Sequence, residues 1–330
     1  MFFVISGYVI TYSAESNLKK QNSPFVFLKA RFLRIYPAFW ASILVVLLTP
    51  FVIEFISSFK SGEFISPSNL LLKYTLLEWF HFVALTKVFF ATSSDLQSQF
   101  NAINSVYWTL AIEFQFYCMV FVALWFRKRY HQIIIGVTVV AFLNMMFPSP
   151  FNYGFFIHHW PAFSLGIGLA YLHKKGFTFS SMFTGKFARL VAVLCSIGFT
   201  IYFANVTGPG KIFFAASFGL LIWVISDFEK MLRKVKESPN KLVYWLLEVW
   251  LILGAMSYSV YLLHGKLYFL PNIFVRQVFD KDNLLFGMLT ILGTLFLCYP
   301  FYYFVERRFL SKNYQKIQQT VLSKPPANHP

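Results

Sequence analysis

The sequence predicts an all-α, polytopic integral membrane protein in which about nine helices cross the bilayer and pack as one bundle. Of its 330 residues, 57% are hydrophobic and 13% are charged, whereas soluble domains average about 45–50% and about 25%. Aromatic side chains make up 21% of the chain, more than the core of a soluble protein of this size can enclose. We therefore expect lipid to surround most of the protein surface.

Eight apolar segments are long enough to cross a bilayer, which needs about 20 residues for about 30 Å of hydrocarbon. A ninth apolar piece, Met1 to Tyr12, is shorter, and we interpret it as the rear part of a helix. Together they account for the nine expected spans. The eight longer segments run approximately over 35–53, 105–126, 132–147, 154–172, 188–206, 211–226, 244–264 and 284–304.

The stretch Leu70 to Phe90 is apolar, but four polar side chains interrupt it, namely Lys73, Glu78, His81 and Lys87. A span here would place two lysines in lipid and would invert every segment that follows. We therefore expect an interfacial or re-entrant helix in an outer loop that covers residues 54–104.

The distribution of Lys and Arg predicts the sidedness of the protein. When the segments alternate between the two sides, 22 of these residues fall on one side and 7 on the other. Translocated loops are depleted in Lys and Arg, so the richer side, which includes the C-terminal tail, is expected to be cytoplasmic. No change in composition marks a second domain. The sequence thus predicts a membrane domain over 1–310 and a polar cytoplasmic tail over 311–330.

The net charge of +16 does not indicate a nucleic-acid-binding protein, because the basic residues occur in short groups between apolar runs. That pattern is typical of contact with anionic lipid headgroups. The three cysteines, Cys118, Cys195 and Cys298, all lie inside apolar runs and form no disulfide or metal-ligating pattern. We expect membrane lipids as partners, and neither nucleic acid nor a bound metal.

Two arginines stand at the expected cytoplasmic entrance of the 35–53 span. Arg31 and Arg34 are three residues apart, so on a helix they share a face and can bind adjacent phosphate groups through charge-assisted hydrogen bonds. The alternative is an anchor that extends to lipid headgroups and only fixes topology.

A carboxylate lies deep in the 105–126 span. Glu113 is at roughly 12 Å depth by helix rise, and an ionisable residue there is a candidate site by default. Thr109 and Tyr117 lie four residues before and after it, so their hydroxyl groups are expected beside the carboxyl, and Trp108 is expected at the outer interface. Glu113 would suit a proton acceptor or a hydrogen-bond donor to substrate. The alternative is a structural carboxyl bonded to a neighbouring helix.

A third polar group ends the 244–264 span. Ser257, Tyr261 and His264 share a helix face and present hydroxyl groups and an imidazole toward the bundle or the outer loop. The alternative is an interfacial histidine that is simply solvated.

These groups belong to a series of five motifs that resembles acyltransferase family 3. In chain order the motifs are Phe2-Phe3-Val4-Ile5-Ser6-Gly7-Tyr8, Arg31-x-x-Arg34-Ile35-Tyr36-Pro37, Trp108-x-Leu110-x-x-Glu113-x-x-Phe116-Tyr117, Ser257-Tyr258-Ser259-x-Tyr261-x-x-His264 and Phe304-Val305-Glu306-Arg307. The family contains bacterial inner-membrane enzymes that acylate sugars of O-antigen lipopolysaccharide, exopolysaccharide, peptidoglycan and related glycans. The resemblance covers almost the whole chain.

The resemblance implies transfer of an acetyl or other short acyl group from a cytoplasmic acyl-CoA to a hydroxyl of a cell-surface or lipid-linked polysaccharide. Acyl-CoA would be a co-substrate, with no permanently bound cofactor. Arg31 and Arg34 match the residues implicated with the acyl donor. Glu113 and His264 are the expected catalytic residues, and the expected substrate-binding residues are Ser6, Gly7, Trp108, Tyr117, Tyr258 and Tyr261.

The resemblance also implies a helix before Phe2 that bears an Arg and a His, the His acting as base on the acceptor hydroxyl, and no residue of this sequence matches them. We expect that the family's first helix is missing here because the start codon is misassigned. Two alternatives remain open. One is an inactive, truncated remnant, and the other is a transporter or flippase of a lipid-linked glycan, which Glu113 would also serve.

Overall fold

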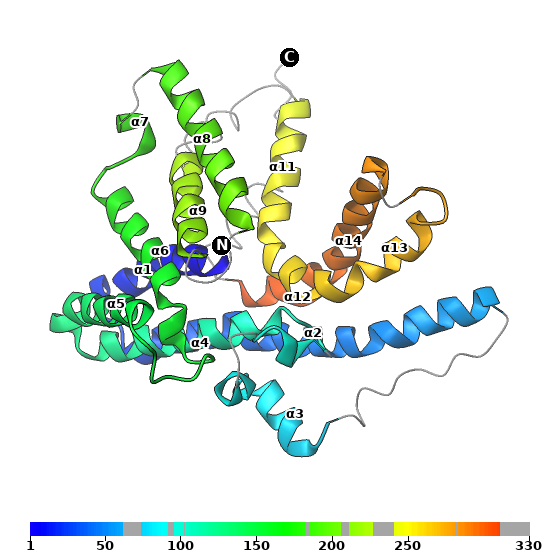
Figure 1. Ribbon diagram of the computed structural model, residues 1–330, viewed down its shortest axis with the longest axis horizontal. Coiled ribbons are helices and arrows are strands. Elements are labelled where there is room, and N and C mark those ends of the chain that lie inside the picture. The colour runs from blue at the N-terminus through cyan, green and yellow to red at the C-terminus, as the bar shows by residue number, and fades with distance from the viewer. Residues whose placement is uncertain are drawn as a thin grey trace, which may run out of the picture. The chain divides into compact units, whose positions relative to one another are not determined.

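The computed structural model describes residues 1–61, 74–91, 96–101, 103–182, 185–205, 211–226, 241–280 and 283–310 (Figure 1). All regular secondary structure within these ranges is helical, which confirms the predicted all-α class for this part of the chain. The predicted tail over 311–330 lies outside the described residues. The chain divides into two compact units, Met1–Arg31 with Ala111–Ser238, and Phe32–Leu110 with Pro239–Pro330.

Three helices are long and apolar enough to cross a membrane, counted over the described ranges. They are α2 (Pro24–Ser61), through its Pro24–Phe59 part, α4 (Tyr107–Trp125) and α14 (Leu284–Phe304). Two shorter apolar helices, α8 (Lys186–Ala204) and α9 (Lys211–Ser226), also match predicted segments. The chain is therefore a helical membrane protein, and the predicted count of nine spans remains a prediction.

The helix ends differ most from prediction near the N-terminus. Helix α1 runs from Phe2 to Lys19, well beyond the apolar piece that ends at Tyr12. Helix α2 begins at Pro24, eleven residues before the predicted span, and proline is well tolerated in a first helical turn because it lacks the N–H that would have no partner there. Arg31 and Arg34 therefore lie within a helix that has already begun.

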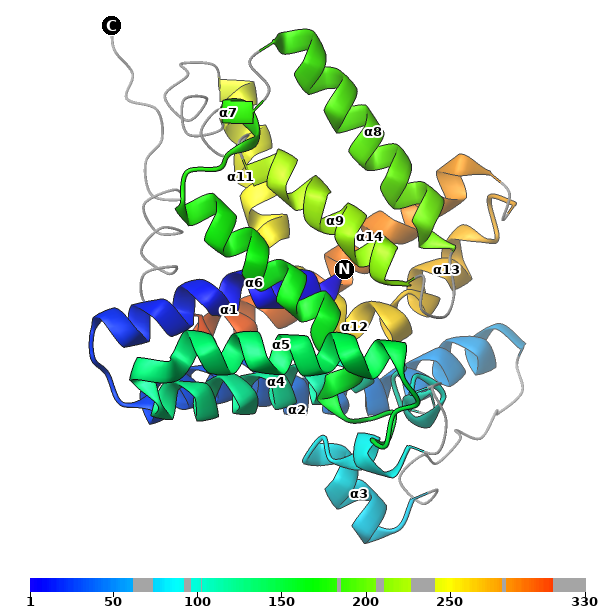
Figure 2. The same ribbon diagram turned by 60° about the vertical axis from the view of Figure 1, so that its left-hand side comes forward.

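The first unit is built around the packing of α1 against α6 (Trp160–Lys174), which Figure 2 shows crossing. Both helices place a glycine at the contact. A Cβ atom on Gly7 would collide with the main chain of Phe163, and one on Gly166 would collide with the main chain of Val4. The close approach of two helix backbones requires such small residues. The unit also contains α5 (Tyr130–Met146), η5 (Phe156–His158), α7 (Phe179–Met182), and the mutually packed α8 and α9.

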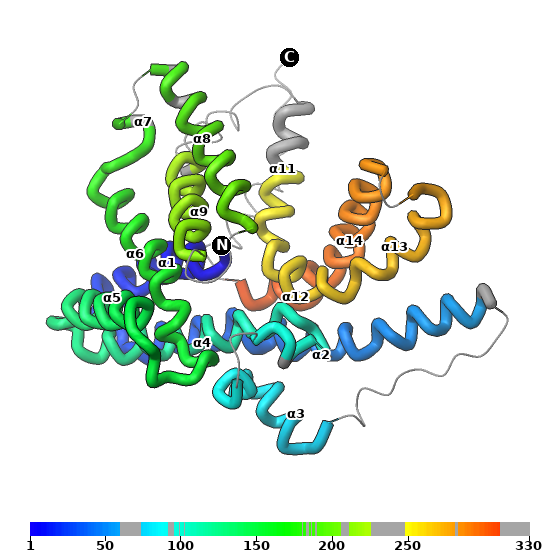
Figure 3. The backbone as a smooth tube through the Cα atoms, in the orientation of Figure 1, coloured from blue at the N-terminus to red at the C-terminus, as the bar shows by residue number. Residues whose placement is uncertain are grey.

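The second unit contains the path from α11 (Lys241–Ala255) through α12 (Ser257–Leu267) and α13 (Phe269–Val275) to α14, which Figure 3 traces. The prediction of one continuous helix over 244–264 is wrong, because α11 ends at Ala255 and a new helix, α12, begins after Met256. The carboxylate of Glu306 accepts the N–H of Ser259, the third residue of α12, at 3.0 Å. A carboxylate is favourable at a helix N-terminus, so Glu306 caps the new helix.

Helix α3 (Leu76–Val83) lies in the segment that was predicted to be interfacial, between residues 70 and 90. Thr75 and Glu78 form a capping box at its start, and hydrogen bonds from Thr75 lower the pKa of Glu78. Leu76, Leu77 and Phe80 are exposed. An exposed apolar face suits a lipid interface, and the placement of α3 at the membrane surface stays a prediction.

Candidate active site

A buried carboxylate with two hydroxyl donors lies in the first unit. Glu113 of α4 is 6% exposed. Its Oε1 atom accepts hydrogen bonds from Ser6 Oγ of α1 and from Tyr117 OH one helical turn later, both at 2.6 Å. Hydrogen bonds from two hydroxyl groups stabilise a carboxylate that burial would otherwise penalise. The structure thus joins the Ser6 motif and the Glu113 motif in one cluster, which we call the Glu113 cluster.

Of the two hydroxyl groups predicted beside Glu113, those of Thr109 and Tyr117, only the Tyr117 hydroxyl contacts the carboxylate. Tyr117 contacts the carboxylate, and Ser6 is the second donor. The side chain of Thr109 instead contacts the carbonyl of Val106, at 3.1 Å, and the hydroxyl of Tyr261. Helical spacing placed Thr109 on the same side as Glu113, but spacing alone does not show which hydroxyl another helix brings to the carboxylate.

Packing around the Glu113 cluster is aromatic and tight. The Phe116 ring stacks on Phe163 of α6, with centroids 4.4 Å apart, and meets the edge of Phe3 of α1 at 5.3 Å. Gly7 is buried against the main chain of α6. These contacts hold α1, α4 and α6 together beside Glu113, and they give Gly7 a packing role.

Arg31 belongs to the first unit and is half-buried. Its Cζ atom lies 5.9 Å from the centroid of the Phe27 ring. The Nε atom is buried and has no hydrogen-bond partner among the described residues. Leaving a buried donor unsatisfied is costly, so this N–H can gain from an added acceptor.

Arg34 belongs to the second unit and has an acidic partner. Its Nη1 atom lies 2.9 Å from Oε1 of Glu306, and its Cζ atom lies 5.0 Å from the centroid of the Tyr258 ring. Tyr258 is itself fixed, because its hydroxyl donates to the carbonyl of Ile35 at 3.1 Å. The sequence did not predict this ion pair, although Glu306 stood in the last of the five motifs.

The last turn of α12 carries His264, which is exposed. Its Nδ1 atom lies 2.9 Å from the carbonyl oxygen of Val260 and 3.0 Å from that of Tyr261. Because carbonyl oxygens only accept, Nδ1 carries the proton, and in the neutral ring Nε2 is the basic nitrogen. His264 is therefore held in the tautomer that a proton acceptor needs.

Tyr261 and Trp108 lie in the same unit as His264. The Tyr261 hydroxyl donates to the carbonyl of Val106 at 2.7 Å and also contacts Thr109. Trp108, the second residue of α4, is half-buried. The side chain of Asn104 adds a further tie between the start of α4 and α12, since it donates to the carbonyl of Leu262 at 2.7 Å.

The ten predicted site residues divide between the two units. The first unit holds Ser6, Gly7, Arg31, Glu113 and Tyr117, and the second holds Arg34, Trp108, Tyr258, Tyr261 and His264. Within each unit, residues from separate motifs are in direct contact: Ser6 with Glu113 in the first, and Arg34 with Tyr258 in the second.

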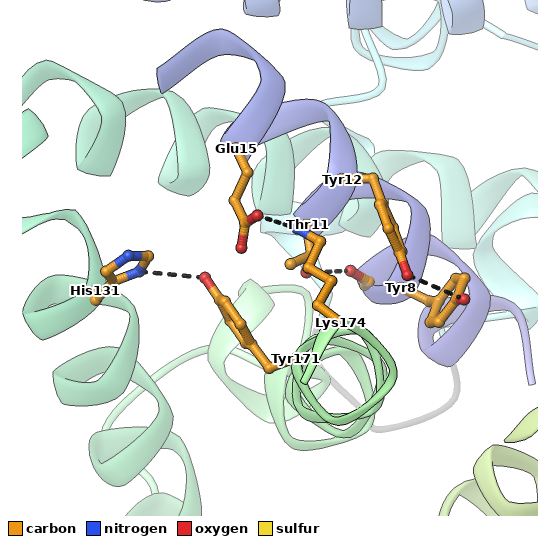
Figure 4. A network of polar contacts seen from close by, with 8 residues as sticks. Tyr8, Thr11, Tyr12, Glu15, His131, Tyr171 and Lys174 are labelled. Carbon is orange, nitrogen blue, oxygen red and sulfur yellow. Dashed lines mark hydrogen bonds and ion pairs between the residues drawn. The ribbon is translucent and has the colours of Figure 1, made fainter. Parts of the chain in front are cut away.

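A polar network in the first unit was not predicted (Figure 4). Lys174 of α6 pairs with Glu15 of α1, and its Nζ atom lies 4.5 Å from the Tyr12 ring centroid. Around this pair, Tyr8 contacts His173 at 3.0 Å, and Tyr171 contacts His131 of α5 at 3.2 Å. The network fastens α1 to α6 and α6 to α5. Its members are spread over three helices, so no local sequence pattern marks it.

A family model described as an acyltransferase domain matches residues 1–303. No curated protein matches the chain, and no solved structure matches it. The family match covers the first four of the five motifs and ends one residue before the last, which begins at Phe304. The chain belongs to acyltransferase family 3.

Proposed function

We propose that this protein moves an acetyl or other short acyl group from acyl-CoA to a hydroxyl group of a cell-surface or lipid-linked polysaccharide. Membership of acyltransferase family 3 supports acyl transfer, and the apolar helices support a membrane location. The proposed setting is the bacterial inner membrane, with the C-terminus and the donor side in the cytoplasm, because 22 of the Lys and Arg residues fall on that side.

The proposal that acyl-CoA is the acyl donor rests on two arginines whose N–H groups can still bind an acceptor. Nε of Arg31 is buried and has no hydrogen-bond acceptor among the described residues, and Nη1 of Arg34 is buried in an ion pair with Glu306 but makes no hydrogen bond among them. Both residues lie on α2, three positions apart. Guanidinium groups bind phosphate through short, charge-assisted hydrogen bonds. The phosphate groups of acyl-CoA would supply the missing acceptors.

The transfer requires a base for the acceptor. The acceptor hydroxyl oxygen attacks the thioester carbonyl carbon, the hydroxyl proton passes to a base, the C–S bond breaks, and the CoA sulfur leaves and takes up a proton. The family resemblance assigns that base to a histidine on a helix before Phe2. His264 is proposed as a further catalytic residue, because its Nδ1-protonated tautomer leaves Nε2 available for proton transfer. Glu113 is the second proposed acid–base group, since its carboxylate is buried with two hydroxyl donors.

The remaining predicted residues are proposed to contact substrate. Trp108 offers a half-buried aromatic face, which suits the apolar face of a sugar ring. Tyr261 lies one helical turn before His264 and would orient the acceptor near it. Ser6 and Tyr117 would act on substrate through the Glu113 cluster, and Tyr258 through Arg34.

The test uses the protein in lipid nanodiscs with acetyl-CoA labelled in its acetyl group and polysaccharide extracted from the envelope. We expect label to appear on the polysaccharide, with CoA released only when the polysaccharide is present. Mass spectrometry then identifies the acylated hydroxyl. Movement of a lipid-linked glycan across vesicles with no consumption of acetyl-CoA would contradict the proposal and favour a flippase.

A further inference from the structure

Glu306 is a buried carboxylate whose partners come from two different helices. It begins the short helix η7 (Glu306–Phe309) directly after α14, and its side chain is 1% exposed. Its Oε2 atom accepts the N–H of Ser259 at 3.0 Å and the Ser259 hydroxyl at 2.5 Å. Its Oε1 atom faces Arg34 of α2. All of these residues belong to the second unit.

The two oxygens of Glu306 have separate tasks. Oε2 is saturated by Ser259 and caps α12. Oε1 lies 2.9 Å from Nη1 of Arg34 as an ion pair, and neither atom has a hydrogen-bond partner among the described residues. A buried carboxylate without a cation would be strongly unfavourable. Arg34 therefore neutralises Glu306 while keeping N–H groups for another acceptor.

Arg34 is held from two directions. Glu306 lies against one edge of its guanidinium, and the ring of Tyr258 lies 5.0 Å from its centre. The Tyr258 ring is anchored through its hydroxyl to Ile35 of the same helix as Arg34. The side chain of Arg34 is still 31% exposed. A guanidinium has five N–H donors in a rigid fork, so a carboxylate at one edge leaves other donors for a ligand.

We propose that Glu306 is a positioning residue for the acyl donor: it fixes the orientation in which the Arg34 guanidinium accepts a phosphate group of CoA. The inference rests on the proposed function. Ordering a long, flexible side chain during binding costs free energy, and a guanidinium that is already ordered avoids that cost. Glu306 therefore acts on donor affinity through Arg34 and has no contact with the acceptor.

The test is a double-mutant cycle on the KM for acetyl-CoA, with Glu306→Ala, Arg34→Ala and the double variant. We expect Glu306→Ala to raise this KM about tenfold in the wild-type background, a coupling typical of neighbouring charged groups. In the Arg34→Ala background the same change should have no further effect on the donor KM. The KM for the polysaccharide should stay unchanged throughout.

The matched control is Asn283→Ala, which removes a different helix cap of the same unit. Asn283 Oδ1 accepts the N–H of Leu285 at the start of α14, at 2.9 Å. This variant should leave both KM values unchanged. If Glu306→Ala fails to fold, Glu306→Gln replaces it, because the amide oxygen can still cap α12 while the charge is lost.

The outcomes separate this inference from the proposed function. Absence of acetyl-CoA consumption by the wild-type protein would contradict the proposed function itself. Normal consumption combined with an unchanged donor KM in the Glu306 variant would overturn the inference alone. Additive effects of the Arg34 and Glu306 changes would also overturn it, because Glu306 would then act independently of Arg34.

Discussion

Ser6 and Glu113 are 107 positions apart in the chain, and the hydroxyl of Ser6 donates to the carboxylate of Glu113 at 2.6 Å. Because Tyr117 donates to the same oxygen, the carboxylate is held from α1 and from its own helix. The contact links a residue of the first motif to the buried charge of the third. Any role of Glu113 in proton transfer therefore depends on how α1 is placed.

Glu113→Gln tests the charge at nearly constant shape. The amide oxygen can still accept from Ser6 and Tyr117, so we expect a folded protein whose kcat falls by about 10²–10⁴-fold, the usual effect of losing an acid–base group. Single-turnover transfer of labelled acetyl measures it. Ser196→Ala is the control, since it removes a buried hydroxyl of α8 that only contacts the carbonyl of Val193. Full activity of Glu113→Gln would mean that the carboxyl group of Glu113 has only a structural role.

The arginine pair should control donor affinity. We expect Arg31→Ala with Arg34→Ala to raise the KM for acetyl-CoA by about 100-fold or more, because each lost charge-assisted hydrogen bond is worth about 1.5–3 kcal/mol. The matched control is Lys128→Ala, an exposed cation of the short helix η4 (Arg127–Arg129). If the KM for acetyl-CoA rose equally in the control, the claim that Arg31 and Arg34 bind the phosphate groups of acyl-CoA would be contradicted.

His264→Asn separates the two ring nitrogens. The asparagine amide can place an N–H donor where Nδ1 stands, toward the carbonyl of Val260, but it offers nothing in place of Nε2. If Nε2 takes part in proton transfer, kcat should fall by about 10²–10⁴-fold, while the KM for acetyl-CoA stays constant. The comparison is His131→Asn, another exposed histidine whose Nδ1 contacts Tyr171. Equal rates for both variants would exclude a catalytic role for His264.

Gly7→Ala should destabilise the first unit. The added methyl group would meet the main chain of Phe163, which cannot move as a side chain tip can, and overpacking typically costs about 1–3 kcal/mol. Gly136→Ala is the control, because nothing lies within 4 Å of its Cβ position. Thermal unfolding in detergent should show a lower midpoint for Gly7→Ala only. The same midpoint in both variants would mean that α1 and α6 do not pack this closely.

Sidedness can be measured with a single cysteine. In a variant without Cys118, Cys195 and Cys298, we place a cysteine at the exposed Lys29, near the start of α2. An impermeant maleimide should label it only after the inner membrane is opened, because that end of α2 is expected to be cytoplasmic. Labelling in intact cells would reverse the proposed topology.

Hydropathy predicted most of the helices well. Helices α4, α5, α8, α9 and α14 end within two residues of the predicted segments, because a continuous apolar run both forms and limits a membrane helix. The polar second half of α1 was missed, since Ser13 to Lys19 carry no apolar signal although they continue the helix. The break at Met256 was also missed, because the residue that caps the new helix, Glu306, is distant in the sequence.

The candidate site was predicted in its residues more than in its contacts. The motifs contain Ser6, Glu113, Tyr258 and Arg34, but sequence spacing could not show that Ser6 meets Glu113 or that Tyr258 covers Arg34. Such pairings are decided by how helices pack, and packing joins residues across more than one hundred positions. The Lys174 and Glu15 pair was missed for the same reason.

The two glycines at the crossing of α1 and α6 also determine how the Glu113 cluster can change. At Gly7 and Gly166 the main chains of α1 and α6 are so close that a Cβ atom would clash. A small shift of α1 along α6 would bring a neighbouring residue with a Cβ atom to this contact, so it would produce a steric clash. Ser6 is next to Gly7, so a displacement of α1 large enough to avoid the clash would also move Ser6 away from Glu113. The hydrogen bond between Ser6 and Glu113 should therefore be either fully formed or fully lost, with no stable intermediate position of α1.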